Sequence, residues 1–356
     1  MTVVCFTSLT LAYLPRARVL AETLRAAHPD WPLWAVLVDR VPPGLDRRDA
    51  FAGFDRVLDA EDLDIPLFRP WLFRHDLIEA CTAVKGAMLL HLQALGADKV
   101  AYFDPDIALF HPLAGLEARL DTASVVLTPH QVTPNDSPIA VGDNELSSMR
   151  YGIYNLGFLA VRTDAVGRAF AAWWAARLRD ACYDDPGNGL FTDQKYCDLV
   201  PGLFDRVAIE RDPGWNVASW NLSRRRVRFG DDGGMTANES PLAFYHFTKH
   251  GGIGAVMTER YARGCHEPHE LWRWYARRLA AHADPAIADL PWHYARFSDG
   301  TPIPPAARRF YRQRPDLLEF FADPFDVAGN SLRSWLERNA PQTLVSADDP
   351  PAFAAR

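Results

Sequence analysis

The sequence lacks any run of apolar residues long enough to cross a bilayer, which takes about 20 in succession. It therefore predicts no transmembrane segment. No basic segment precedes the apolar residues at the start of the chain, so residues 3–6 are interpreted as a buried strand and not as part of a signal peptide. Cysteine is scarce, and its five occurrences are dispersed without a Cys-x-x-Cys pair. Such a set indicates free thiols in a reducing compartment, and the expected location is the cytoplasm.

An excess of positive charge is also missing. Lys and Arg number 38 against 45 Asp and Glu, which gives a formal net charge of -7. Proteins that bind nucleic acid usually gather basic side chains to neutralise phosphates, so no nucleic-acid partner is expected. The basic cluster at 224–228 is interpreted as a solvated strand edge. Hydrophobic residues make up 48% of the chain, and its 356 residues are enough for one large α/β domain or for one domain plus an appendage.

Short apolar runs alternate with longer amphipathic stretches in the first half of the chain, which predicts a mainly parallel sheet covered by helices. The expected strands span residues 1–8, 33–38, 99–103, 124–128, 158–161 and 243–247. The expected helices span residues 16–27, 81–95, 168–179 and about 270–282. From about residue 258 the segments are helical and interrupted by prolines. We therefore expect a main α/β domain at 1–257, a helical C-terminal extension at 258–340 and a loose tail at 341–356.

The strongest chemical feature is the segment that ends the expected strand at 99–103. Asp104 and Asp106 follow this strand directly, and Pro105 stiffens the turn between them. Ligands of open α/β sheets bind beyond the carboxyl ends of the strands. Two acidic oxygen donors at that place suit a divalent cation, Mn²⁺ or Mg²⁺, which would offset the charge of a departing nucleoside diphosphate. The alternative interpretation is a surface turn with a helix cap.

Further candidate residues follow in a defined order along the chain. They are Thr7, Ser8 and Tyr13 near the first strand, Asp39 after the second, Lys85, Asn155 with Gly157, the pair Asp193 and Gln194, and His246 with Lys249. Structural roles are the alternatives. Asn155 and Gly157 could form a turn. Thr192 could be the N-cap of a helix that begins beside it, and His246 could be a core histidine.

In this order the motifs over residues 1–255 resemble those of GT-A glycosyltransferases, especially the retaining branch with glycogenin and the bacterial lipopolysaccharide galactosyl- and glucosyltransferases. The resemblance implies a Rossmann-like α/β/α sandwich and makes 1–257 the nucleotide-sugar-binding catalytic domain. It implies that Asp104, Asp106 and His246 bind the metal, and that Asp193 and Gln194 act at the reacting carbon. The donor-binding residues that it implies are Thr7, Ser8, Tyr13, Asp39, Lys85, Asp104, Asn155, Gly157 and Lys249. The chain departs from glycogenin in having no Lys-Pro-Trp after its His246 segment.

The implied activity is the transfer of a hexose-type sugar from a nucleoside diphosphate sugar, with UDP favoured, to a hydroxyl of a glycan, glycolipid or protein. Retention of configuration and a role in bacterial surface glycan or glycoconjugate synthesis follow from the same resemblance. A sugar-nucleotide nucleotidyltransferase is an alternative, but it should carry a Gly-rich basic loop after its first strand, and residues 8–11 contain neither Gly nor Lys. A metal-dependent hydrolase would need more clustered His and Asp ligands than the scattered histidines provide. A non-catalytic nucleotide-sugar-binding protein is a further alternative, which donor hydrolysis decides.

Overall fold

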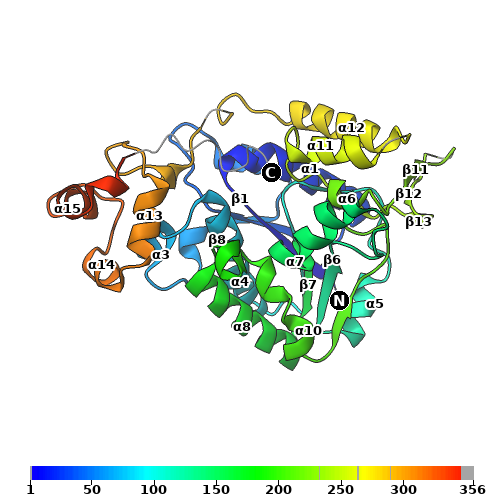
Figure 1. Cartoon of the computed structure of the whole chain (residues 1–356), viewed down its shortest axis with the longest axis horizontal. Coiled ribbons are helices and arrows are strands. Elements are labelled where there is room, and N and C mark those ends of the chain that lie inside the picture. Colours follow the sequence, from blue (N-terminus) through cyan, green and yellow to red (C-terminus); the bar gives the residue numbers. More distant parts are fainter. Residues whose placement is uncertain (1, 232, 263, 289, 346–356) are drawn as a thin grey trace.

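The computed structural model describes residues 2–231, 233–262, 264–288 and 290–345 (Figure 1). A seven-stranded sheet lies at its centre, in the order β10-β6-β7-β4-β1-β2-β3. Its strands are β1 (Val3–Leu9), β2 (Leu33–Leu37), β3 (Arg56–Asp59), β4 (Lys99–Phe103), β6 (Val125–Pro129), β7 (Tyr154–Arg162) and β10 (Val207–Ile209). β7 is antiparallel to both neighbours, and the other pairs are parallel. The predicted α/β fold with a mainly parallel sheet is confirmed.

The remaining elements are short except for four helices. The long helices are α1 (Leu14–Ala27), α4 (Leu77–Ala94), α8 (Ala165–Ala181) and α12 (Glu267–Ala281). The shorter α-helices are α2 (Arg47–Ala50), α3 (Phe68–Phe73), α5 (Leu116–Thr122), α6 (Pro138–Ala140), α7 (Ser147–Tyr151), α9 (Gln194–Cys197), α10 (Val200–Leu203), α11 (Ile253–Tyr261), α13 (Pro305–Arg312), α14 (Pro315–Phe320) and α15 (Leu332–Asn339). The short strands are β5 (Ile107–Leu109), β8 (Asp184–Asp185), β9 (Leu190–Phe191), β11 (Val227–Phe229), β12 (Met235–Ala237), β13 (Ser240–Pro241) and β14 (Phe244–His246).

Helices cover both faces of the central sheet because successive strand side chains point to opposite faces. In β1, Cys5 is buried with apolar residues of α1 and α5, while Phe6 is buried with those of α4 and α8. α4 lies directly against α8, where a Cβ added at Gly86 would be 2.5 Å from Ala175 Cα. The close contact of these two helices fixes α4 over the sheet, and α4 carries Lys85.

The strands and helices predicted from the apolar patterns are all present near their expected positions, from β1 and α1 to β14 and α12. The interpretation of residues 224–228 as a solvated edge is wrong for Arg225. Its guanidinium is buried and donates to the carbonyls of Pro213 and Trp215, and burial lowers its pKa to about 9. The neighbouring arginines in the sequence gave no indication that two backbone carbonyls accept hydrogen bonds from Arg225.

The segments after α11 share hydrophobic clusters with the main sheet and its helices. Tyr311 of α13 and Phe325 each lie 5.0 Å, between ring centroids, from Phe73 of α3. α11 spans the expected boundary at residue 257, and the division into three parts stays a prediction. Of the expected loose tail at 341–356, residues 346–356 lie outside the described residues. In the described ranges, we find no helix with the length and apolarity that crossing a membrane requires.

Candidate active site

Three side chains that could hold a metal ion converge where β4 ends. Asp104 follows β4, and its N–H donates to the carbonyl of Gly157 on β7 (2.8 Å). β5 begins directly after Asp106 and pairs antiparallel with β14, which sets His246 opposite Ile107. One ligand atom from each of Asp104, Asp106 and His246 lies within 4.8 Å of the others. The pairing of two short strands therefore brings together the three residues expected to bind metal.

The imidazole of His246 is fixed between an amide oxygen and two carboxylates. Its Nδ1 lies 3.2 Å from Asn155 Oδ1, and its Nε2 lies 3.0 Å from Asp106 Oδ1 and 3.6 Å from Asp104 Oδ2. Because an amide oxygen only accepts, Nδ1–H donates to Asn155 and the other ring nitrogen points at the carboxylates. Two carboxylates and a nitrogen lone pair that face one point repel one another unless a cation lies between them. This donor set fits a divalent metal ion, and Asn155 orients the imidazole.

The electrostatics of this cluster agree with a need for positive charge. Burial is the largest single effect and would lower the pKa of His246, but the carboxylates of Asp106 and Asp104 together outweigh burial and raise this pKa. Burial would raise the pKa of Asp106, and His246 lowers it. The Asp104 side chain is 26% exposed, against 11% for Asp106 and 4% for His246. The cluster therefore opens to solvent on the Asp104 side, where a phosphate oxygen could reach a bound metal ion.

Asn155 and Gly157 lie within β7, so the alternative interpretation of these residues as a turn is wrong. Besides His246, Asn155 Oδ1 accepts hydrogen bonds from the N–H of Gly157 (3.1 Å) and from Asn216 Nδ2 (3.0 Å). Gly157 has no room for a side chain, because a Cβ there would lie 2.4 Å from His246 Cε1. The glycine is needed for the close approach of β7 to the imidazole.

Lys85 on α4 is buried beside the carboxylates. Its Nζ lies 2.7 Å from Asp193 Oδ2 and 3.2 Å from Asp104 Oδ1, and donates to the carbonyl of Leu156 (3.1 Å). The Nζ is also 4.1 Å from the ring centroid of Tyr102. Burial opposes the charge of this ammonium, but Asp104 and Asp193 raise the pKa of Lys85 well above its usual range. A positive charge therefore joins the candidate metal cluster to Asp193.

Asp193 and Gln194 differ in where their side chains lie. Asp193 is buried against Lys85, and its carbonyl accepts from Trp174 Nε1 (3.2 Å). Gln194 Nε2 donates to the carbonyl of Tyr151 (2.9 Å) and thereby contacts the end of α7. Thr192 makes no side-chain cap for α9, so the N-cap interpretation is wrong. The backbone of Thr192 is left-handed, with a φ of 44°, and for a β-branched residue this conformation is strained.

The carboxyl end of β1 lies beside Lys85 and Asp104. Ser8 Oγ donates to the carbonyl of Cys81 on α4 (2.7 Å) and lies 3.2 Å from the hydroxyl of Tyr102. That hydroxyl donates to Asp104 Oδ1 (2.6 Å). Thr7 is buried, and its hydroxyl has no hydrogen-bond partner among the described residues. Ser8 thus connects β1 to the carboxylate, while Thr7 does not contact it.

The other predicted donor-binding residues lie around this centre. Asp39 follows β2, and its carboxylate accepts from the backbone N–H groups of Leu11, Arg40 and His293. Tyr13 is 38% exposed next to α1. Lys249 follows β14, where burial lowers its pKa against the opposing charge of Asp184. Asp39 thus joins the segments that follow β1 and β2 to the backbone at His293, and Asp184 of β8 is the carboxylate that acts on the charge of Lys249.

Several residues of this neighbourhood were missed by the sequence interpretation. Tyr102 could have been found, because it lies on β4 two residues before Asp104, a spacing that places side chains on the same face of extended chain. Arg16 lies one helical turn after Tyr13, and its guanidinium is 4.6 Å from the centroid of that ring. The contact of Asn216 with Asn155 could not be inferred from local sequence patterns, because Asn216 lies in a loop far from Asn155 along the chain.

No family model matches the chain. Two curated relatives are uncharacterized proteins of Bacillus subtilis (strain 168). YfnF is 28% identical over 152 residues, which cover 42% of this chain and 49% of the relative. YfnD is 30% identical over 178 residues, which cover 48% of this chain and 53% of the relative. The match thus spans about half the length of these relatives.

The chain is similar in structure to solved glycosyltransferases. The galactosyltransferase LgtC with donor and acceptor sugar analogues has a TM-score of 0.42 at 13% identity, covering 81% of this chain and 97% of that one. The bifunctional glycosyltransferase WbbM has a TM-score of 0.44 at 14% identity, with 78% and 51% covered. Mouse xyloside xylosyltransferase 1 has a TM-score of 0.42 at 12% identity, with 70% and 98% covered. At TM-scores below 0.5, the function has to be argued from the site itself.

Proposed function

We propose that the protein is a metal-dependent glycosyltransferase that moves a hexose-type sugar from a nucleoside diphosphate sugar to an acceptor hydroxyl. The observation that carries the proposal is the group of Asp104, Asp106 and His246 at the carboxyl end of β4, with a buried lysine in contact. Two carboxylates, one oriented imidazole and an open side suit a metal ion that also binds a ligand. UDP is the favoured nucleotide, and a glycan, glycolipid or protein is the acceptor.

In this proposal Asp104, Asp106 and His246 hold Mn²⁺ or Mg²⁺, and Mn²⁺ is favoured because it accepts an imidazole more readily. The bound ion would offset the negative charge of the departing diphosphate. Asn155 keeps the ring of His246 turned toward the carboxylates (3.2 Å). Gly157 leaves space for that ring.

The lysine and the residues around it serve the donor in the same proposal. Lys85 holds the carboxylates of Asp104 and Asp193 in place, and its charge lies where a diphosphate sugar would bind. Asp193 faces the reacting sugar together with its neighbour Gln194, and Tyr13 offers an exposed ring for the base. Retention of configuration and a role in bacterial surface glycan synthesis belong to the proposal as well. The cytoplasm is the proposed compartment, supported by five cysteines that form no disulfide.

The test is nucleotide release from a panel of UDP-, GDP-, ADP- and TDP-sugars, with Mn²⁺ and with EDTA. Release from one donor should require the metal and fall to background in the Asp104→Asn/Asp106→Asn variant. The matched control is Asp30→Asn/Asp62→Asn, which removes two acidic groups from exposed positions and should keep full activity. Metal-independent release, or equal loss in both variants, would contradict the proposal.

Two further measurements on the same samples, nucleotide binding and pyrophosphate release, distinguish the alternative functions. A non-catalytic nucleotide-sugar-binding protein would bind UDP, measured by calorimetry, and would leave every donor intact in the presence of an acceptor mixture. A nucleotidyltransferase would release pyrophosphate from a nucleoside triphosphate and a sugar phosphate. Either result would replace the transferase proposal.

A further inference from the structure

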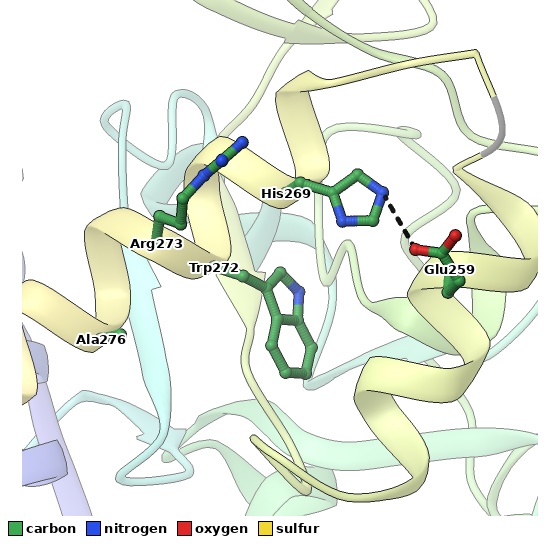
Figure 2. A pocket seen from close by; sticks show the side chains of 5 residues that line it. All are labelled: Glu259, His269, Trp272, Arg273 and Ala276. Atoms are coloured by element: carbon green, nitrogen blue, oxygen red, sulfur yellow. Dashed lines mark ion pairs between the residues drawn. The ribbon is translucent and has the colours of Figure 1, made fainter.

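An open groove of about 520 Å³ lies between α11 and α12. Glu259 of α11 and His269, Trp272, Arg273 and Ala276 of α12 line it. Figure 2 shows Trp272 and His269 pointing from α12 into the space between the two helices, with Glu259 facing them from α11. A volume of this size is in the range of small-ligand sites, which span roughly 300–1,000 Å³.

The indole of Trp272 forms a fixed side of this groove. Its Nε1 donates to the hydroxyl of Tyr245 (3.1 Å), and its ring stacks on His250 with centroids 5.1 Å apart and planes 12° from parallel. A Cβ added at Gly254 would lie 2.8 Å from Trp272 Cη2, so the ring also rests on the backbone of α11. An aromatic ring held in this way loses little conformational entropy when a ligand packs against it.

The polar groups of the groove carry mixed charge. His269 Nε2 and Glu259 Oε2 are 3.9 Å apart, which is too long for a hydrogen bond, and their side chains are 37% and 82% exposed. Arg273 is exposed and pairs with Glu270 (2.9 Å) on its own helix. Because the lining holds one carboxylate, one guanidinium and one imidazole, without an excess of one sign, the groove does not favour a phosphate or a polyanion. It favours a neutral ligand with many hydroxyls and an apolar face.

We propose that this groove binds an oligosaccharide chain, and that it holds the saccharide part of the acceptor away from the reacting hydroxyl. The role as an acceptor subsite rests on the transferase function proposed above. Trp272 connects the groove to the strand of the candidate site, because it donates to Tyr245, the residue before the candidate metal ligand His246 on β14, and stacks on His250, four residues after His246. A saccharide packed on the indole would be hydrogen-bonded by His269 and Glu259.

Calorimetric titration and saturation-transfer NMR of the full chain with gluco-, galacto- and manno-oligosaccharides of two to six units test the proposal. At least one series should bind with a Kd at or below about 10 mM. Trp272→Ala should weaken that binding about tenfold or more, and Trp272→Phe should restore part of it. Glu259→Gln with His269→Ala tests the polar groups without touching the indole. The matched control is Trp274→Ala. Trp274 is a half-buried tryptophan on the same helix as Trp272, but it packs on Phe110 and does not line the groove.

Each outcome decides the proposal. Absence of binding throughout the panel, or equal weakening by Trp274→Ala and Trp272→Ala, would overturn it. Binding of an acidic or basic peptide in place of any saccharide would also overturn it. Nucleotide release is measured separately on the same samples. Saccharide binding without metal-dependent release would reject the transferase function and keep the groove, while release without saccharide binding would reject the groove alone.

Discussion

Among single residues, Gly157 and His246 define how tightly the candidate metal site is built. A Cβ at position 157 would lie 2.4 Å from His246 Cε1, far inside normal contact distance. Gly157→Ala should therefore turn the imidazole away from the carboxylates and weaken Mn²⁺ binding by about 10- to 100-fold, as loss of an orienting contact does. Manganese titration followed by electron paramagnetic resonance measures this change. Gly202→Ala, at a helical position with open space, is the control and should bind Mn²⁺ normally.

Lys85 and Asp193 form a buried pair whose members should depend on each other. Lys85→Met leaves the Asp193 carboxylate, 4% exposed, without its partner at 2.7 Å, and should cost about 3–5 kcal/mol in the free energy of unfolding. Asp193→Asn should cost less, because Lys85 keeps Asp104 and the carbonyl of Leu156. Urea unfolding of both single variants and of the double variant measures the coupling. Additive effects of the two changes would show that the pair does not act as a unit.

At the scale of elements, the segment that follows α3 carries a histidine, His75, that should make stability depend on pH. His75 is fully buried, with Nδ1 2.8 Å from the carbonyl of Trp71. Burial, with Arg74, Arg312 and Arg308 nearby, lowers its pKa well below the usual range. Below a pH of about 6.5 the unfolded chain therefore binds a proton that the folded chain does not. The free energy of unfolding should fall with falling pH by about 1.4 kcal/mol per unit from this residue.

Urea unfolding at about pH 7.5 and about pH 5.5 measures this dependence. His75→Gln should remove the contribution and show a shallower loss of stability in acid than the unchanged chain. The control is His266→Gln, which replaces an exposed histidine and should keep the steep loss. Equal slopes for the unchanged chain and His75→Gln would refute the assignment.

The elements that carry the site were predictable where a local run of apolar residues indicates a strand or a helix. β4 has the predicted bounds, because the apolar run at residues 100–103 indicates a strand and the acidic residues directly after it indicate the sheet edge. The pairing of β5 with β14 was not predictable. Each strand has only three residues, and the two lie far apart in the chain, so the sequence carries no signal for their register. The contact of Asn216 with Asn155 and the burial of Arg225 both depend on the segment between β10 and β11. Local patterns therefore gave the layers, and tertiary pairing decided which polar groups meet.

At the scale of the whole molecule, the C-terminal extension is joined to the site through a buried ion pair. Arg312 of α13 lies 2.8 Å from Glu79 of α4, with side chains 15% and 4% exposed, and its guanidinium stacks 3.7 Å above the ring of Tyr183. Glu79 also accepts from the N–H of Asp184 in β8 (3.0 Å). The pair thus connects the extension to the helix that carries Lys85 and to the hairpin that leads to Asp193.

Arg312→Leu should consequently lower the free energy of unfolding and change the KM for the donor. It leaves Glu79 buried without a counter-charge, so the free energy of unfolding should fall by about 3–5 kcal/mol. Arg314→Leu is the matched control two residues away, because its partner Asp316 is exposed and such a surface pair contributes at most about 1 kcal/mol. Urea unfolding compares the two variants, and the KM for the donor shows whether the loss reaches the Lys85 region. Similar effects of both changes would mean that the extension is only packed against the domain and does not support its site.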